Sequence, residues 1–66
     1  MAIIKVIEVL ANSKESWEDA TKNAIQQASK SVKNIRSAYV AEQSVVVNDD
    51  QVTEFRVNLK LSFEVK

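Results

Sequence analysis

Carboxylates are the side chains in this sequence best suited to hold a metal ion. The 66 residues include nine Asp and Glu but no His and no Cys, so zinc lacks its usual nitrogen and sulfur ligands. The carboxylates outside the expected helix that could contribute are Glu8, Glu42, Asp49, Asp50, Glu54 and Glu64. They form no contiguous loop motif, so they either meet across several chains or are solvated and paired with Lys and Arg.

The missing residue types also bear on catalysis. Without His or Cys, the Ser residues have no partner of the kind found in Ser–His or Cys–His nucleophile pairs. Without Gly there is no glycine-rich loop to cradle a phosphate. We therefore expect a protein that is not an enzyme.

Length and charge narrow the classes of partner. We expect one domain over 1–66, and a domain this small buries only about 60% of its unfolded surface. Disulfides are excluded because there is no Cys, which leaves self-association as the main further support. The nine Lys and Arg balance the nine Asp and Glu, which argues against an electrostatic nucleic-acid binder.

The N-terminal apolar segment is not expected to enter a membrane. Lys5 and Glu8 interrupt it, and no apolar run approaches the ~20 residues that a membrane span needs. No signal-peptide cleavage motif follows, so we expect a cytoplasmic protein without a membrane partner.

Periodicity predicts the elements that position these side chains. Residues 2–10 are rich in Ile and Val and predict a strand with apolar residues on both faces. Apolar residues at spacings of three and four then predict a helix over 14–32. Ser13 is the first N-cap candidate, and Ser16, followed by Asp19, is the alternative one turn later.

The second half of the chain predicts a hairpin. Strands are expected over 35–47 and 52–66, joined by a turn of Asn, Asp and Gln. The class is therefore α+β, with β-α-β-β order, and an antiparallel sheet results if the last strand lies between the other two. A strand of 14 residues spans roughly 45 Å at ~3.4 Å per residue, whereas a helix of 19 residues spans roughly 28 Å. One helix cannot cover such a sheet, so we expect another copy of the chain to cover the remainder.

Three segments, in this order and spacing, resemble the dodecin family over nearly the whole chain. They are IIKVIEVLANSKESWEDATKNAI, NIRSAYVAEQ and FRVNLKLSFEVK. The resemblance implies a three-stranded antiparallel sheet wrapped around one helix, with twelve subunits forming a hollow homododecameric shell. It also implies storage or sequestration of flavin, bound in pairs between subunits and stacked between tryptophans.

Two positions depart from the flavin-binding members. Ser37 stands where those members have the stacking Trp, and Arg56 stands where they have a Gln that hydrogen-bonds the flavin. Ser37 offers no ring for stacking, and Arg56 has donors only. We therefore expect binding of FMN or riboflavin to be weak or absent. The sequence resembles the calcium-dodecin-like members, which lack the stacking Trp, at Asn34-Ile35-Arg36 and at Phe55-Arg56.

Three interpretations of the altered pocket follow. Arg36 and Arg56 could favour an anionic, phosphate-bearing ligand such as FMN or another nucleotide-like cofactor. Arg56 could equally form a cross-strand or intersubunit ion pair, for example with Glu42 or Glu54. The assembly could instead bind Ca²⁺, with ligands that the sequence does not identify. The third interpretation is a structural or interaction assembly with no small ligand.

Overall fold

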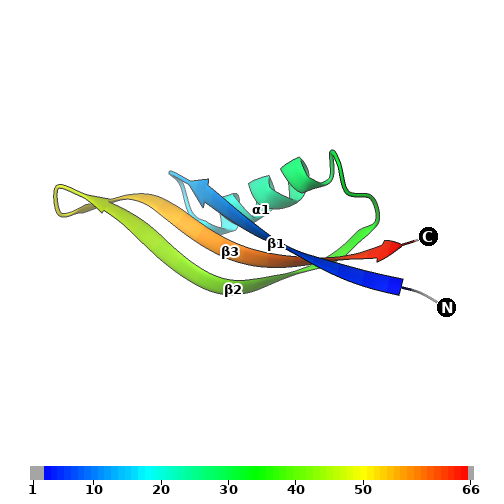
Figure 1. Ribbon diagram of the computed structural model, residues 1–66. Helices are drawn as coiled ribbons and strands as arrows, with labels where there is room; N and C mark the ends of the chain where they lie inside the picture. The colour runs from blue at the N-terminus through cyan, green and yellow to red at the C-terminus, as the bar shows by residue number, and fades with distance from the viewer. Residues whose placement is uncertain (1–2, 66) are drawn as a thin grey trace.

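The computed structural model describes residues 3–65, which form one helix and three strands. In chain order these are β1 (Ile3–Ser13), α1 (Trp17–Ala28), β2 (Ile35–Asn48) and β3 (Gln51–Val65). The strands form one antiparallel sheet in the order β1-β3-β2, and α1 lies on one face of it (Figure 1). The predicted class, element order and central position of the last strand are confirmed.

The helix begins later than its first N-cap candidate suggested. Ser16 is the N-cap, and its hydroxyl accepts a hydrogen bond from the Asp19 backbone N–H at 3.0 Å. Ser13 instead ends β1, where it pairs with Phe55, so its backbone cannot also start a helix. Its buried hydroxyl donates to Asp19 Oδ2 at 2.6 Å and thereby ties the strand end to the first helical turn.

The helix also ends before the predicted residue 32. After Ala28 the chain turns, with the Ser31 and Val32 N–H groups both bonded to the Ala28 carbonyl. Asn34 then adopts a left-handed φ of 63° immediately before β2. Asn tolerates this conformation better than most residues other than Gly, so it redirects the chain into the strand.

The strands are close to their predicted lengths. β1 extends to Ser13 instead of residue 10, and residues 2 and 66, which the prediction included, lie outside the described part of the chain. The β2–β3 turn consists of Asp49 and Asp50, with φ of 51° and 62°. Positive φ at both central residues is typical of the tight turns that match the twist of a hairpin.

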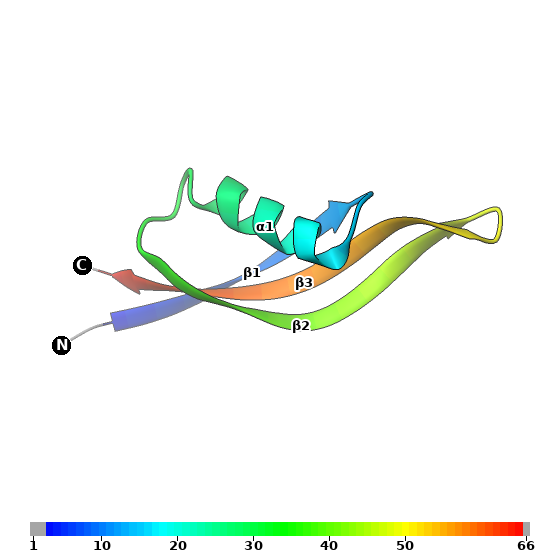
Figure 2. The same ribbon diagram turned by 180° about the vertical axis from the view of Figure 1, so that it is seen from behind.

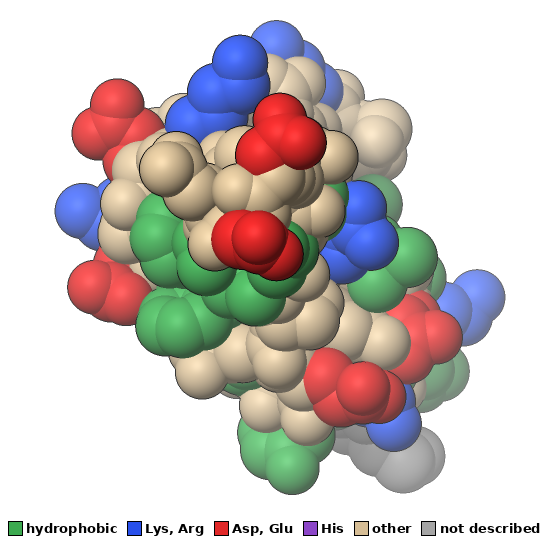
Figure 3. All heavy atoms as spheres, turned by 90° about the vertical axis from the view of Figure 1, so that its left-hand side faces the viewer, with side chains coloured by type: hydrophobic (Ala, Val, Ile, Leu, Met, Phe, Trp, Pro, Cys, Tyr) green, Lys and Arg blue, Asp and Glu red, His purple; other side chains and the backbone are tan. Residues whose placement is uncertain are grey.

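The β2–β3 hairpin extends well beyond the helix. Both ribbon views show it projecting past the N-terminal end of α1 (Figures 1 and 2), and the molecule measures 51 × 19 × 14 Å. Val45, Val47 and Val52 near this end are 39%, 56% and 53% exposed. Seen end-on, acidic side chains stand in front of hydrophobic ones (Figure 3). The helix thus leaves an apolar part of the sheet uncovered, as the element lengths predicted.

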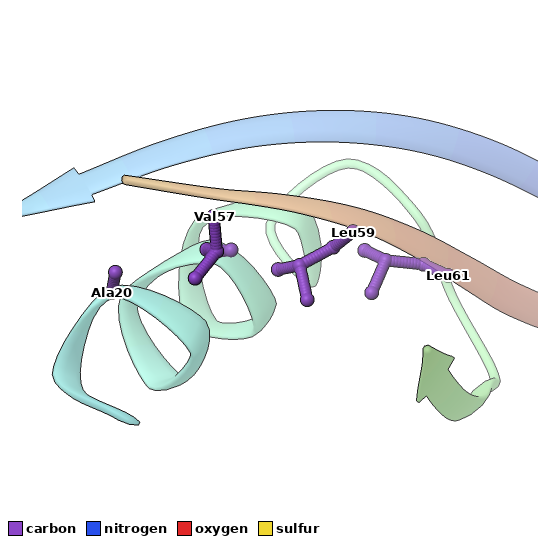
Figure 4. Close-up of a cluster of buried hydrophobic side chains, with 5 residues drawn as sticks. Ala20, Val57, Leu59 and Leu61 are labelled. Carbon is purple, nitrogen blue, oxygen red and sulfur yellow. The ribbon is translucent and has the colours of Figure 1, made fainter. Parts of the chain in front are cut away.

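The core lies between α1 and the middle of β3. Val57, Leu59 and Leu61 point from β3 toward the helix and are fully buried, and Ala20 of α1 faces them (Figure 4). Small alanine side chains let the helix approach the sheet closely, and close packing maximises dispersion contacts. From Phe55 onward, the strict alternation of β3 therefore assigns its even-numbered residues to the face that carries no helix.

Candidate functional site

The helix-free face of β3 carries polar and charged residues, and it includes Arg56, one of the expected site residues. They are Arg56, Asn58, Lys60, Ser62 and Glu64; β1 pairs with each of them, and β2 pairs with all but Glu64. The register places Ser37 beside Ser62. It places Arg56 between Asn12 of β1 and Ser44 of β2.

The Arg56 side chain is hydrogen-bonded to a neutral side-chain amide. Its Nε donates to Asn12 Oδ1 at 3.1 Å, and Asn12 Nδ2 donates to Glu54 Oε1 at 3.4 Å. Within the described chain Arg56 forms no ion pair with Glu42 or Glu54, so that alternative is wrong for a single subunit. Since Arg56 is also exposed, its positive charge remains available at the surface.

Ser37 lies at the opposite end of this face. Its hydroxyl hydrogen-bonds that of Ser62 on β3. The register shifts between Ile35 and Ser37, and the intervening Arg36 forms an ion pair with Glu64 at 3.4 Å. The charge of Arg36 is therefore partly neutralised within its own chain, unlike that of Arg56.

Distance separates the expected site residues into two groups. Ser37 pairs with Ser62, and Arg56 lies six residues earlier on β3, which corresponds to about 20 Å at ~3.4 Å per residue. Arg36 and Ser37 share one end of the face, whereas Arg56 lies at the other. Residues of both groups could contact one small ligand only if different copies of the chain supplied them.

Sequence reasoning missed two polar residues on this face. Asn12 was missed because β1 was expected to end at residue 10, with Asn12 in the connection to the helix. Asn58 was recognised only as part of the polar alternation of β3, yet its Oδ1 is buried and has no hydrogen-bond partner in the described chain. The contacts of both residues depend on register and packing between strands, and the pattern of one strand does not reveal these.

Trp17 contacts both strands of the β2–β3 hairpin. Its indole Nε1 donates to the Ser44 carbonyl at 3.0 Å, and its ring meets that of Phe55 edge-on, with centroids 5.2 Å apart. It therefore connects the start of α1 to the base of the hairpin. Such edge-to-face pairs contribute about 0.5–1.5 kcal/mol beyond the area they bury.

The described chain provides no ready metal centre. Within residues 3–65 no group of three or more Asp or Glu side chains is placed to hold a metal ion. Asp49 and Asp50 lie at the hairpin tip, whereas Glu8 pairs with Lys60 in the ladder of the sheet. No helix in the same range is long and apolar enough to span a membrane.

Comparison with known proteins connects this geometry to a family. The family model described as Dodecin matches residues 3–66. The chain belongs to the dodecin family. Calcium dodecin of Mycobacterium tuberculosis is 38% identical over 66 residues, covering all of this chain and 93% of that protein.

Solved structures of the family share the fold. A crystal structure of calcium dodecin from M. tuberculosis, described as having a novel calcium-binding site, is 38% identical with a TM-score of 0.85, over 97% of this chain and 91% of that one. Dodecin from Streptomyces coelicolor is 28% identical with a TM-score of 0.94, over 98% and 93% of the two chains. The family inferred from sequence, including its similarity to calcium dodecin, is confirmed.

Proposed function

We propose that the chain is the subunit of a homododecameric shell that binds or stores a small ligand and is not an enzyme. The observation that carries this proposal is the large apolar surface left open in the single chain. Among residues 3–65, ten large hydrophobic residues are exposed, whereas the buried core consists of Ala20, Ala24, Val57, Leu59 and Leu61. Exposed apolar patches of this kind mark interaction surfaces, and family membership supports self-association as the way they are covered.

The ligand site in this proposal lies between copies. Arg56 of one copy and the Arg36–Ser37 end of another would face the ligand together, because about 20 Å separates these groups within one chain. Flavin supplies an aromatic ring system that needs stacking partners, and Ser37 offers none. The exposed guanidinium of Arg56 favours an anionic ligand instead.

Native mass spectrometry tests the assembly. We expect a mass near 89 kDa, the product of twelve chains and 7.4 kDa per chain. A monomer or dimer at micromolar concentration would contradict the proposal. Mass steps of retained ligand would indicate directly whether a flavin or another small molecule accompanies the shell.

Flavin titration tests the pocket through a gain of function. We expect FMN and riboflavin to keep most of their fluorescence with the natural chain. The double variant Ser37→Trp with Arg56→Gln should quench both flavins, because it restores the stacking ring and the amide. Ser37→Trp alone and Arg56→Gln alone are the matched controls. Strong quenching by the natural chain would refute the role given to Ser37 and Arg56.

Calcium is the second candidate ligand, and it rests on the relative that is 38% identical and named calcium dodecin. The described part of one chain offers no cluster of carboxylates for it, so a site would combine side chains from several copies. A ligand that binds only the folded state raises the midpoint of thermal unfolding. We expect millimolar CaCl₂, compared with EDTA, to raise this midpoint. The same midpoint in both would exclude a calcium site that stabilises the fold.

A further inference from the structure

An apolar groove lies between the helix and the first strand. This α1–β1 groove has a volume of about 480 Å³. Its apolar lining comes from Ile7, Val9, Ala11, Ala24, Ala28 and Val32. β1 is an edge strand of the sheet, so the groove opens beside a row of backbone groups that no strand of the same chain pairs. Such edges are templates for strand addition by another chain.

The end of the β2–β3 hairpin exposes apolar side chains, which suit the apolar α1–β1 groove. Val45, Val47 and Val52 are apolar and exposed, and they belong to the β2–β3 hairpin, whose end projects past α1 (Figure 1). β-branched side chains keep few rotamers, so their burial costs little entropy. Because a two-stranded hairpin alone is only marginally stable in water, this segment needs a surface to pack against.

The charges at the hairpin turn and at the two ends of α1 favour one orientation of the hairpin in the groove. The hairpin turn carries Asp49 and Asp50. Lys30 and Lys33 flank the groove residues Ser31 and Val32 beyond the end of α1. The first turn of α1 carries the opposite charge, from Glu18 and Asp19. An acidic tip is attracted to the lysine end and repelled from the acidic end.

We propose that the β2–β3 hairpin of one copy docks in the α1–β1 groove of the next, with its tip toward Lys30 and Lys33. The inference rests on the self-association in the proposed function and names one of its contact surfaces. The two surfaces differ, so the contact is head-to-tail and must close into a ring if it is not to extend into a filament.

Disulfide trapping tests this contact, because the chain has no Cys of its own. Gln27 lines the groove, whereas its neighbour Gln26 does not, and both are exposed. The test chain carries Val47→Cys with Gln27→Cys, and the control chain carries Val47→Cys with Gln26→Cys. After mild oxidation of the assembled proteins, we expect about tenfold more disulfide-linked product from the test chain. This product should end at a closed covalent ring larger than a dimer.

The same samples separate failure of the contact from failure of the assembly. An intact dodecamer with equal linking in both chains, or with only Val47–Val47 dimers, would overturn the head-to-tail contact and leave the shell standing. A monomer in native mass spectrometry would overturn both.

Maleimide labelling provides a readout that does not depend on disulfide geometry. In assembled single variants, we expect Gln27→Cys to react about tenfold more slowly than Gln26→Cys, because the neighbouring hairpin covers position 27. Equal rates would show a groove open to solvent or to a small molecule, which contradicts the proposal.

Discussion

β3 passes through two different environments along its length. Under α1, Val57 is fully buried, whereas Val52 of the same strand is 53% exposed, and Val47 opposite it is 56% exposed. The ladder with β2 continues through both regions, so backbone pairing does not distinguish them. The difference is the layer above the sheet, because α1 has only 12 residues. A strand can thus keep its backbone hydrogen bonds along its whole length while packing stabilises only part of it. The uncovered part is the one available to another chain.

The largest expected effect tests the covered region. Leu59→Ala should lower the free energy of unfolding by about 2–5 kcal/mol, because it removes a fully buried side chain and leaves a cavity. Urea denaturation at fixed protein concentration, followed by circular dichroism, measures this change. Lys60→Ala is the matched control on the opposite face and should change the free energy by less than about 0.5 kcal/mol. Similar losses in the two variants would mean that the faces of β3 are not distinct.

The boundary between the two regions depends on Trp17. Trp17→Phe should cost about 1 kcal/mol, because it keeps an aromatic ring near Phe55 but loses the hydrogen bond to the Ser44 carbonyl. Thermal unfolding by circular dichroism measures the cost. Ser44→Ala keeps the backbone carbonyl and should be nearly neutral. If Ser44→Ala destabilises as much as Trp17→Phe, the indole hydrogen bond is not what holds the hairpin base.

The far end of the helix-free face provides a weaker contact. Arg36→Gln removes an ion pair with Glu64 in which the Arg36 side chain is 53% exposed. The expected loss is about 0.2–1 kcal/mol at low salt, and it should disappear in 1 M NaCl because exposed pairs are screened. Urea denaturation at both salt concentrations measures it, with Lys33→Gln as a control for the loss of one charge. A loss that persists at high salt would show that Arg36 contributes by packing.

The smallest expected effect lies at the hairpin tip, and it is a gain. Asp50→Gly places Gly where φ is 62°, which removes the cost of a left-handed side-chain residue. The greater backbone freedom of Gly in the unfolded state offsets most of this benefit, so we expect a net gain of about 0.3 kcal/mol. Replicate thermal denaturation measures the gain, with Thr53→Gly within β3 as the destabilising comparison. A loss at position 50 would indicate that the Asp50 side chain itself makes a stabilising contact.

Local patterns predicted the fold well because each element carries its own periodicity. Apolar and polar residues alternate along β3 and put Val57, Leu59 and Leu61 on one face, and the three- and four-residue spacing in α1 puts Ala20 and Ala24 against them. One error occurred where two elements compete for the same residue. Ser13 suits a helix cap, but pairing with Phe55 draws it into the sheet.

The candidate site was less predictable, because it depends on which residues lie opposite one another. Ser37 and Arg56 were grouped as positions of one family pocket, yet the register separates them by six residues along β3. Asn12 contacts Arg56 only because β1 extends far enough to reach it. Register between strands is set by tertiary packing, so a single sequence gives the residues of such a site without their neighbours.

The central position of β3 in the sheet also determines when the subunit can fold during its synthesis. β3 is synthesised after β1, α1 and β2, yet it is the strand with which both β1 and β2 pair. While the ribosome still holds β3, the helix has no core beneath it and β1 has no partner in its own chain. The subunit therefore folds only after this strand emerges, and a nascent chain carries its apolar first strand unprotected until then.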